Sequence, residues 1–300
     1  MGSADPLHPE GVRDLVRVRA DRHGGRFWRR FTSWAFARAH RLVPIVLGEH
    51  EQVAASLPIV FMHSGAGLWP MALTRLTEAG TCALVSPDGQ WRGSYVPSIL
   101  RVHPFAAQRT DAGDPELLVD EASGLVTDDR GDEPFFDDSG DPAPAVREVI
   151  AFFQMRASAE QRTRMAMAEV AARAPLVPLS GPPAVSQMDV QGLFVPNPAR
   201  IEGLGRADLG ALHRCGALAL LQVQAVSMHH LPFLAAAEAR LDQPSPYRPP
   251  EASAGLPGGD AALSGFLEAL AQSRDRDVGG GGPTAGEKTV DINTSYTVPR

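Results

Sequence analysis

The stretch from Gly89 to Phe105 constrains the fold more than any other part of this sequence. Its seventeen residues hold three aromatic side chains, two arginines and two prolines. Asp88-Gly89 at its start predicts a tight turn, because glycine accepts a positive φ and aspartate bonds its own backbone. The turn would join a β-hairpin whose arms are residues 82–85 and Trp91. A short helix is expected over residues 98–102, since one proline suits its first turn and the next ends it.

Short apolar runs bounded by glycine and proline predict further strands before residue 141. These runs are residues 43–47, 58–62, 71–73 and 117–119. Because no long helix separates them, they favour an antiparallel sheet. Apolar residues at helical spacing then predict a helix over 144–174 and a helical region over 207–241, broken near Gly216 and Pro232, with a strand pair at 185–195 between them. The fold class expected is α+β, a curved antiparallel sheet flanked by helices in one main domain.

Composition divides the chain into three parts. Residues 1–40 form an Arg-rich N-terminal extension with interleaved aromatics, residues 41–241 hold the α+β domain, and residues 242–300 form a Pro/Gly-rich tail. The tail is expected to be disordered, with one short amphipathic helix at 263–270, because it cannot bury enough apolar area to offset its ordering entropy. The extension has two interpretations. It makes a weak contact with an anionic surface through its arginines, or it is a flexible arm or a helix docked on the domain by its aromatics.

The charge and the cysteine content indicate a cytoplasmic protein that does not bind nucleic acid specifically. The net charge of −7 argues against a nucleic-acid-binding chain as a whole. Cys82 and Cys215 are too few for a disulfide framework, which favours a reducing compartment. Arg29-Arg30 is followed by charged residues and not by the apolar region of an export signal. The most apolar run, residues 217–228, is interrupted by glutamines and falls short of the about 18 residues that a membrane span needs.

Familiar catalytic and cofactor motifs fail on their spacing. The acidic pairs between residues 111 and 141 lack the register of a calcium loop. Gly65-Ala66-Gly67 follows an apolar run, but the third glycine of a dinucleotide loop is missing. His229-His230 cannot share one helix face, and His213 and Cys215 lack the spacing of a zinc site. We therefore expect no cofactor, no metal and no assignable catalytic residue.

The candidate site lies in the central stretch and in two acids outside it. Its members are polar or aromatic side chains that could line a pocket: Trp91, Arg92, Tyr95, Arg101, His103, Phe105, Glu49 and Asp120. In one interpretation the aromatics fill the core and Arg101 pairs with Glu49 or Asp120. In the other, the aromatics wall a pocket and the arginines hold an anionic or peptide ligand, because a guanidinium donates in a fork to carboxylates.

An ordered set of segments resembles the SapC family of bacterial proteins. The set reads PIVLGEH…LPIVF…DGQWRGSYVPSILRVHPF…VDEASG…FFDDSGDP and extends over roughly residues 40 to 240. The family is named after a gene in an S-layer protein transport cluster. The resemblance implies a link to S-layer or surface-protein transport. The lack of a recognisable catalytic constellation, with the basic aromatic extension and the tail as docking elements, favours an accessory protein that binds a protein or peptide client. The alternative is an enzyme or small-molecule sensor that uses a pocket around Trp91, Tyr95 and Arg101.

Overall fold

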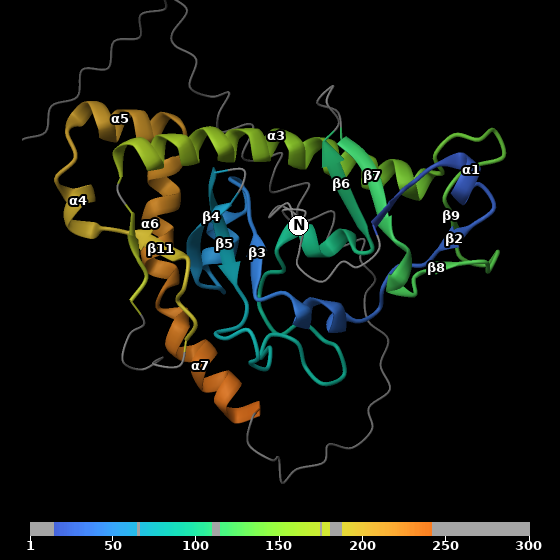
Figure 1. The fold of residues 1–300 in the computed structure, drawn as a ribbon, viewed down its shortest axis with the longest axis horizontal. Helices are drawn as coiled ribbons and strands as arrows, with labels where there is room; N and C mark the ends of the chain where they lie inside the picture. The colour runs from blue at the N-terminus through green and yellow to red at the C-terminus, as the bar shows by residue number, and fades with distance from the viewer. Residues whose placement is uncertain (1–14, 65–66, 110–114, 175, 181–187, 242–300) are drawn as a thin grey trace, which may run out of the picture.

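A computed structural model describes residues 15–64, 67–109, 115–174, 176–180 and 188–241 (Figure 1). Its helices and antiparallel sheets confirm the α+β class. The predicted tail at 242–300, with its short helix at 263–270, lies outside the described residues, as does the first part of the strand pair predicted at 185–195.

The largest sheet has five strands in the order β10-β11-β4-β5-β3, all paired antiparallel. Its central pair, β4 and β5, places Ile59 opposite Ala72. Residues 68–73 of β5 are buried without alternation, because both faces of this strand are covered. The sheet contains the strands predicted at 58–62 and 71–73, whereas the strand predicted at 43–47 ends at Pro44. The bounds are β3 Leu42–Pro44, β4 Ile59–Ser64, β5 Gly67–Leu73, β10 Leu176–Pro178 and β11 Leu193–Pro196.

Two smaller sheets take the place of one continuous curved sheet. One has the order β1-β7-β6, and the other has the order β8-β2-β9. In each of them an early strand pairs with strands from about 100 residues later, as in Leu15 opposite Asp120 and Trp28 opposite Val126. The bounds are β1 Leu15–Arg17, β2 Phe27–Trp28, β6 Phe105–Arg109, β7 Pro115–Asp120, β8 Val126–Thr127 and β9 Glu133–Pro134.

The helix α3 (Pro144–Arg173) crosses the molecule and packs against both β5 and β7 (Figure 1). It confirms the helix predicted at 144–174, with Pro144 in its first turn. The helical region after it breaks at Gly216, whose φ of 75° suits glycine. Its second break lies at residues 228–229, close to Pro232, which falls within the first turn of α7. The bounds of the remaining helices are α1 Ala20–His23, α2 His50–Ala54, α4 Pro198–Glu202, α5 Arg206–Arg214, α6 Ala217–Ser227, α7 His230–Leu241 and the 3-10 helices η1 Trp34–Ala39, η2 Ser98–Val102 and η3 Glu121–Ser123.

Within the predicted N-terminal extension, residues 15–40 contribute strands and core side chains to the domain. Trp28 and Ala37 are buried. Several arginines of this segment form ion pairs with acids from residues 116–148. These pairs are Arg17–Glu116 at 3.0 Å, Arg22–Glu121 at 2.7 Å, Arg26–Asp128 at 2.7 Å and Arg30–Glu148 at 3.5 Å. Part of the basic charge of the segment is therefore matched by carboxylates of the same domain.

Within the described residues, no single helix is long and apolar enough to cross a membrane. The bent pair α5 and α6, with 88° between its members, meets the criteria of length and composition only when the two helices are taken together.

Candidate functional site

The central turn forms, but the hairpin around it is shorter than predicted. Gly89 has a φ of 88°, and its N–H donates to the carbonyl of Ser86 over 2.8 Å. The arms meet in a single bridge between Val85 and Trp91. The side chain of Ser86 accepts from the N–H of Gln90 at 2.8 Å, so a local side-chain bond replaces part of the strand ladder.

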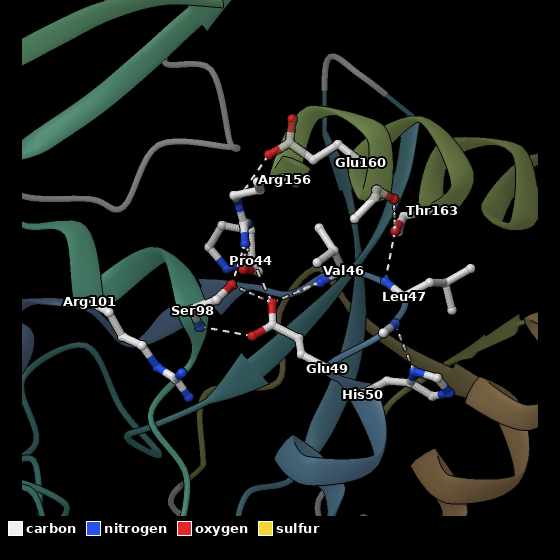
Figure 2. Close-up of polar contacts among 12 residues, drawn as sticks. Pro44, Val46, Leu47, Glu49, His50, Ser98, Arg101, Arg156, Glu160 and Thr163 are labelled. Atoms are coloured by element: carbon white, nitrogen blue, oxygen red, sulfur yellow. Dashed lines mark hydrogen bonds and ion pairs between the residues drawn. The ribbon is translucent and has the colours of Figure 1, made fainter. Parts of the chain in front are cut away.

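The helix predicted at 98–102 forms as η2, which a buried polar network holds in place. Glu49 is fully buried at the start of α2. Its Oε2 accepts from Tyr95 Oη at 3.0 Å and from the N–H of Ser98 at 2.8 Å. Its Oε1 accepts from Ser98 Oγ at 2.9 Å and from the N–H of Val46 at 3.1 Å (Figure 2). The carboxylate therefore fixes the first residue of η2 against the β3–α2 connection.

Arg156 on α3 supplies the positive charge of this network, and the sequence reasoning did not find it. Its Nη1 lies 3.4 Å from Glu49 Oε1 and donates to Ser98 Oγ at 2.7 Å. Its Nη2 donates to the carbonyl of Pro44 at 3.2 Å, and its Nε lies 3.0 Å from Glu160 Oε1 (Figure 2). The sequence does indicate that Arg156 is buried, because it continues the helical spacing of the apolar positions Val149 and Phe153. An arginine at a core position of a helix indicates a buried acidic partner.

Tyr95 and Arg101 lie together beside this network. Burial, followed by the neighbouring Glu49 carboxylate, raises the pKa of Tyr95, so its hydroxyl stays protonated and donates to Glu49. The Arg101 guanidinium lies 4.6 Å from the centre of the Tyr95 ring, and its Nε donates to the carbonyl of Val96 at 2.9 Å. Trp91 Nε1 donates to the carbonyl of Tyr95 at 3.0 Å. Glu49 takes its ion-pair contact from Arg156, while Arg101 stacks on Tyr95.

The end of η2 and the residues after it line one side of a small hollow of about 30 Å³. It lies between the end of η2, the segment around β2 and the first turns of α3. Its walls are mostly apolar and aromatic, with charged groups among them. The lining residues are Trp28, Arg30, Phe31, Arg101, Val102, His103, Phe105, Ala145, Glu148 and Val149. Phe105 packs edge-on against Trp28 with ring centres 4.8 Å apart, and both are buried.

The predicted site residues thus divide among several places. Arg101, His103 and Phe105 line the hollow, while Glu49 and Tyr95 belong to the buried network. Arg92 is exposed. Asp120 is buried and begins η3, where its Oδ1 accepts from the N–H of Ala122 at 3.0 Å.

A cluster of rings adjoins the hollow and shares Phe31 and His103 with it. Its members come from the N-terminal segment and from the central stretch: Phe31, Trp34, Phe36, Trp91 and His103. His103 stacks on Phe36 with ring centres 3.9 Å apart, and Trp34 meets Trp91 edge-on at 6.1 Å. The aromatics of residues 27–36 are apparent in the sequence, but their position at the candidate site is not. Their close spacing in the sequence indicates that this segment packs against the domain.

His40 and His103 are held neutral at neutral pH. Burial and then Arg75 lower the pKa of His40 to about 4. Burial and then His40 lower the pKa of His103 to about 4. An unfolded histidine has a pKa of 6.5, so the unfolded chain binds more protons between these values. Stability is therefore present above pH 6.5 and is lost as the pH falls toward 4.

We expect the free energy of unfolding to fall by up to about 2 kcal/mol between about pH 7 and pH 5 through His40 alone, since each pKa unit corresponds to about 1.4 kcal/mol. Urea unfolding of the wild type and of His40→Asn at both pH values measures this loss. The exposed His63 supplies the matched control, His63→Asn. A His40→Asn chain that loses as much stability as the wild type would contradict the assignment.

Among the residues that the structure describes, no group of three or more His, Cys, Asp or Glu side chains is arranged to hold a metal ion. His63 and His103 have different ring partners. His63 meets Phe194 edge-on at 5.2 Å, whereas His103 stacks on Phe36.

Comparison with known families gives one finding. The family model described as SapC matches residues 18–234, which is well over half of the chain. The match begins earlier than residue 40, in keeping with the strands that residues 15–40 contribute. No curated protein and no solved structure matches.

Proposed function

The chain belongs to the SapC family, and from this premise we propose that it is a client-binding protein. It contacts a protein or peptide client at the surface around the hollow between η2 and α3. The observation that carries the proposal is the lining itself, which combines aromatic residues with two arginines. Binding sites commonly have this composition, with few polar groups that fix the orientation of a ligand.

The buried network supports this proposal because it positions one wall of the hollow. Glu49 and Arg156 both bind Ser98, the first residue of η2. The other end of η2 leads into Arg101 and His103, which line the hollow. A wall fixed in this way loses little conformational entropy when a ligand arrives, which favours affinity.

The family name supports a link to S-layer or surface-protein transport. In this proposal the client is such a protein, and the two meet in the cytoplasm before export. Both cysteines are free thiols in the structure, which is consistent with a reducing compartment. The proposal does not use an anionic surface as partner, because several arginines of the N-terminal segment already face carboxylates.

Filling the hollow should abolish client binding. Ala145 is buried and lines the hollow, whereas Ala151 is exposed on the same helix. We expect Ala145→Phe to reduce client capture at least tenfold and Ala151→Phe to leave it unchanged. Capture is measured with a photo-crosslinking amino acid at the exposed position 148, and the joined peptide is identified by mass spectrometry.

Circular dichroism first confirms that both variants fold. If Ala145→Phe does not fold, the crosslink from position 148 is compared with one from position 151 in the otherwise unchanged chain. Equal capture by Ala145→Phe and the wild type, or equal crosslinks from both positions, would overturn the proposal. A small molecule that copurifies with the wild type and not with Ala145→Phe would favour the alternative of an enzyme or sensor.

A further inference from the structure

We infer that α6 and α7 carry a docking surface for residues 263–270 of the same chain, here named the tail segment. The tail segment lies outside the described residues, and its sequence predicts a short amphipathic helix. The docking surface is a row of exposed positions on the two helices, here named the seam: Gln222, Val226, His229, Phe233, Ala236 and Arg240. None of the seam residues lines the hollow, so the inference goes beyond the proposed function.

The seam holds the two most exposed large apolar side chains of the described residues. Phe233 is 73% exposed, and Val226 is 64% exposed. The sequence between Arg214 and Glu238 contains no Asp, Glu, Lys or Arg, so no charged side chain interrupts this part of the surface. Alanines and a proline beside the row are exposed as well, at positions 225, 232 and 239. A contiguous apolar surface of this kind indicates an interaction site.

Buried hydrogen bonds on the opposite side of both helices hold the seam outward. On α6, the buried Gln224 donates from Nε2 to the carbonyl of Ile59 at 2.9 Å. On α7, the buried Glu238 accepts from the N–H of Leu76 at 2.9 Å. A rotation that turned Phe233 inward would break these bonds and leave buried polar groups without partners, which is costly. The exposure of the seam is therefore fixed by the fold.

The seam has the spacing of a helix–helix contact. Its members follow one another at alternating steps of four and three residues. This alternation averages about 3.5 residues and keeps one face of a helix toward a partner helix, as in coiled coils. The row continues across the short break between α6 and α7 with the same spacing. The spacing therefore favours a helical partner.

The tail segment has the matching apolar pattern. Leu263, Phe266, Leu267 and Leu270 stand at i, i+3, i+4 and i+7, so a helix would place all four on one face. Glu268 would lie on the opposite face of that helix, where it remains in contact with water. A helix with one apolar face needs an apolar surface to cover it, and the seam supplies such a surface.

The connection between α7 and the tail segment favours contact within one chain. α7 ends at Leu241, and the 21 residues 242–262 come before the tail segment. An unstructured linker of this length spans about 25 Å on average, whereas α7 is about 18 Å long. The chain can therefore return antiparallel along α7, which brings Asp260 next to Arg240. Such a linker gives an effective concentration of about millimolar order, which favours the tail segment over a second copy or another protein.

The test places a photo-crosslinking amino acid at the exposed position 236 of the full chain. We expect crosslinks to residues 263–270 at least tenfold more often than from the exposed position 151 on α3. Leu267→Asp should reduce these crosslinks at least tenfold, since it puts a charge on the apolar face. Glu268→Gln, on the opposite face, is the control and should leave them unchanged. Equal crosslinking by Leu267→Asp and by the unsubstituted segment would overturn the inference.

An equal mixture of isotope-labelled and unlabelled chains identifies the occupant of the seam. Docking within one chain gives crosslinked peptide pairs in which both peptides are labelled or both are unlabelled. Mixed pairs would show that a second copy provides the segment, and they would overturn the inference. A crosslink from position 236 to a different protein, or to no part of the tail segment, would overturn it as well.

Hydrogen exchange of the unmodified chain gives an independent measurement. The amides of residues 263–270 should exchange at least tenfold more slowly in the wild type than in Phe233→Ser, because docking stabilises the hydrogen bonds of the helix. Met165→Ser replaces a side chain on α3 that is 59% exposed, and this matched control should leave the exchange unchanged. Equal exchange in the wild type and in Phe233→Ser would contradict docking on the seam.

Discussion

Arg156→Met should destabilise the folded chain by about 3–5 kcal/mol, the cost of breaking a buried ion pair by removing one partner. Arg156 is 1% exposed, and it lies between Glu49, which is fully buried, and Glu160. Methionine has a similar length but no charge, so the substitution leaves two carboxylates near each other without their common cation. Domains of ordinary stability have about 5–15 kcal/mol to lose.

Removal of the acidic partner, in Glu49→Gln, should destabilise the chain less, because Arg156 has a second acidic partner in Glu160. In Glu49→Gln the guanidinium keeps Glu160 and the carbonyl of Pro44. We expect a loss of about 1–3 kcal/mol, which reflects the weakened hydrogen bonds to Ser98 and Val46. The double substitution should cost less than the sum of the single ones, since the stranded Glu49 charge is then absent.

Urea unfolding followed by circular dichroism measures all of these variants. A loss below about 1 kcal/mol in Arg156→Met, or a greater loss in Glu49→Gln, would show that the network does not hold the charges as described. Arg164→Met, on the same helix with its hydrogen bond to Gln161 exposed, is the control and should change stability by less than about 0.5 kcal/mol.

The network also links stability to binding. Ser98 is the contact through which Glu49 and Arg156 hold η2. We infer that a folded but weakened variant such as Glu49→Gln presents Arg101 and His103 less precisely placed at the hollow. Glu49 is in this view a positioning residue and does not itself reach the ligand, since it is fully buried among these donors.

The sequence predicts individual helices and strands well. The helix from Pro144 was readable from its apolar period and its first-turn proline. The strands around 58–62 and 71–73 were readable as short apolar runs between glycine and proline. Each of these signals lies within the element that it predicts.

What the sequence could not provide is the pairing of distant segments. Val126 and Glu133 lie in no strand that the sequence predicts, yet they pair with Trp28 across about 100 residues. Short strands carry too few alternating positions to specify such a register by themselves. The hollow depends on this pairing, because it brings Trp28 and Phe31 to Phe105 and His103.

The candidate site shows the same division. The central stretch was identified from its own residues, and Arg101, His103 and Phe105 do line the hollow. Their partners Arg30, Glu148 and Val149 come from other parts of the chain. The residues of one sequence segment therefore predict one wall of a site. The residues of the opposite walls can be identified only when the fold is known.

Gly89→Ala should destabilise the chain by about 2–5 kcal/mol through two separate causes. Gly89 has a φ of 88°, which costs an L-residue about 1–2 kcal/mol. A β-carbon here would also lie 1.9 Å from Ser33 Oγ and 2.9 Å from Ser33 Cβ. Such overpacking adds about 1–3 kcal/mol.

Because of the contact with Ser33, Gly89→Ala should also change the position of η1, which carries rings of the aromatic cluster. Gly89 accepts at its carbonyl from the N–H of Trp34 over 2.7 Å, and Ser33 begins η1 by accepting from Ala35. Movement of Ser33 away from a new β-carbon therefore displaces η1 and its rings. We expect a changed near-ultraviolet circular dichroism signal, because Trp34 and Trp91 lie 6.1 Å apart.

A matched glycine separates the two causes. Gly124 has a φ of 74°, and a β-carbon added there would meet nothing within 4 Å, so Gly124→Ala should cost the backbone strain alone, about 1–2 kcal/mol. Ser33→Gly combined with Gly89→Ala removes the clash and should recover the overpacking cost, measured against Ser33→Gly by urea unfolding. If Gly89→Ala and Gly124→Ala cost the same, the close approach of Ser33 does not constrain the turn, and the link from the central stretch to the N-terminal rings fails.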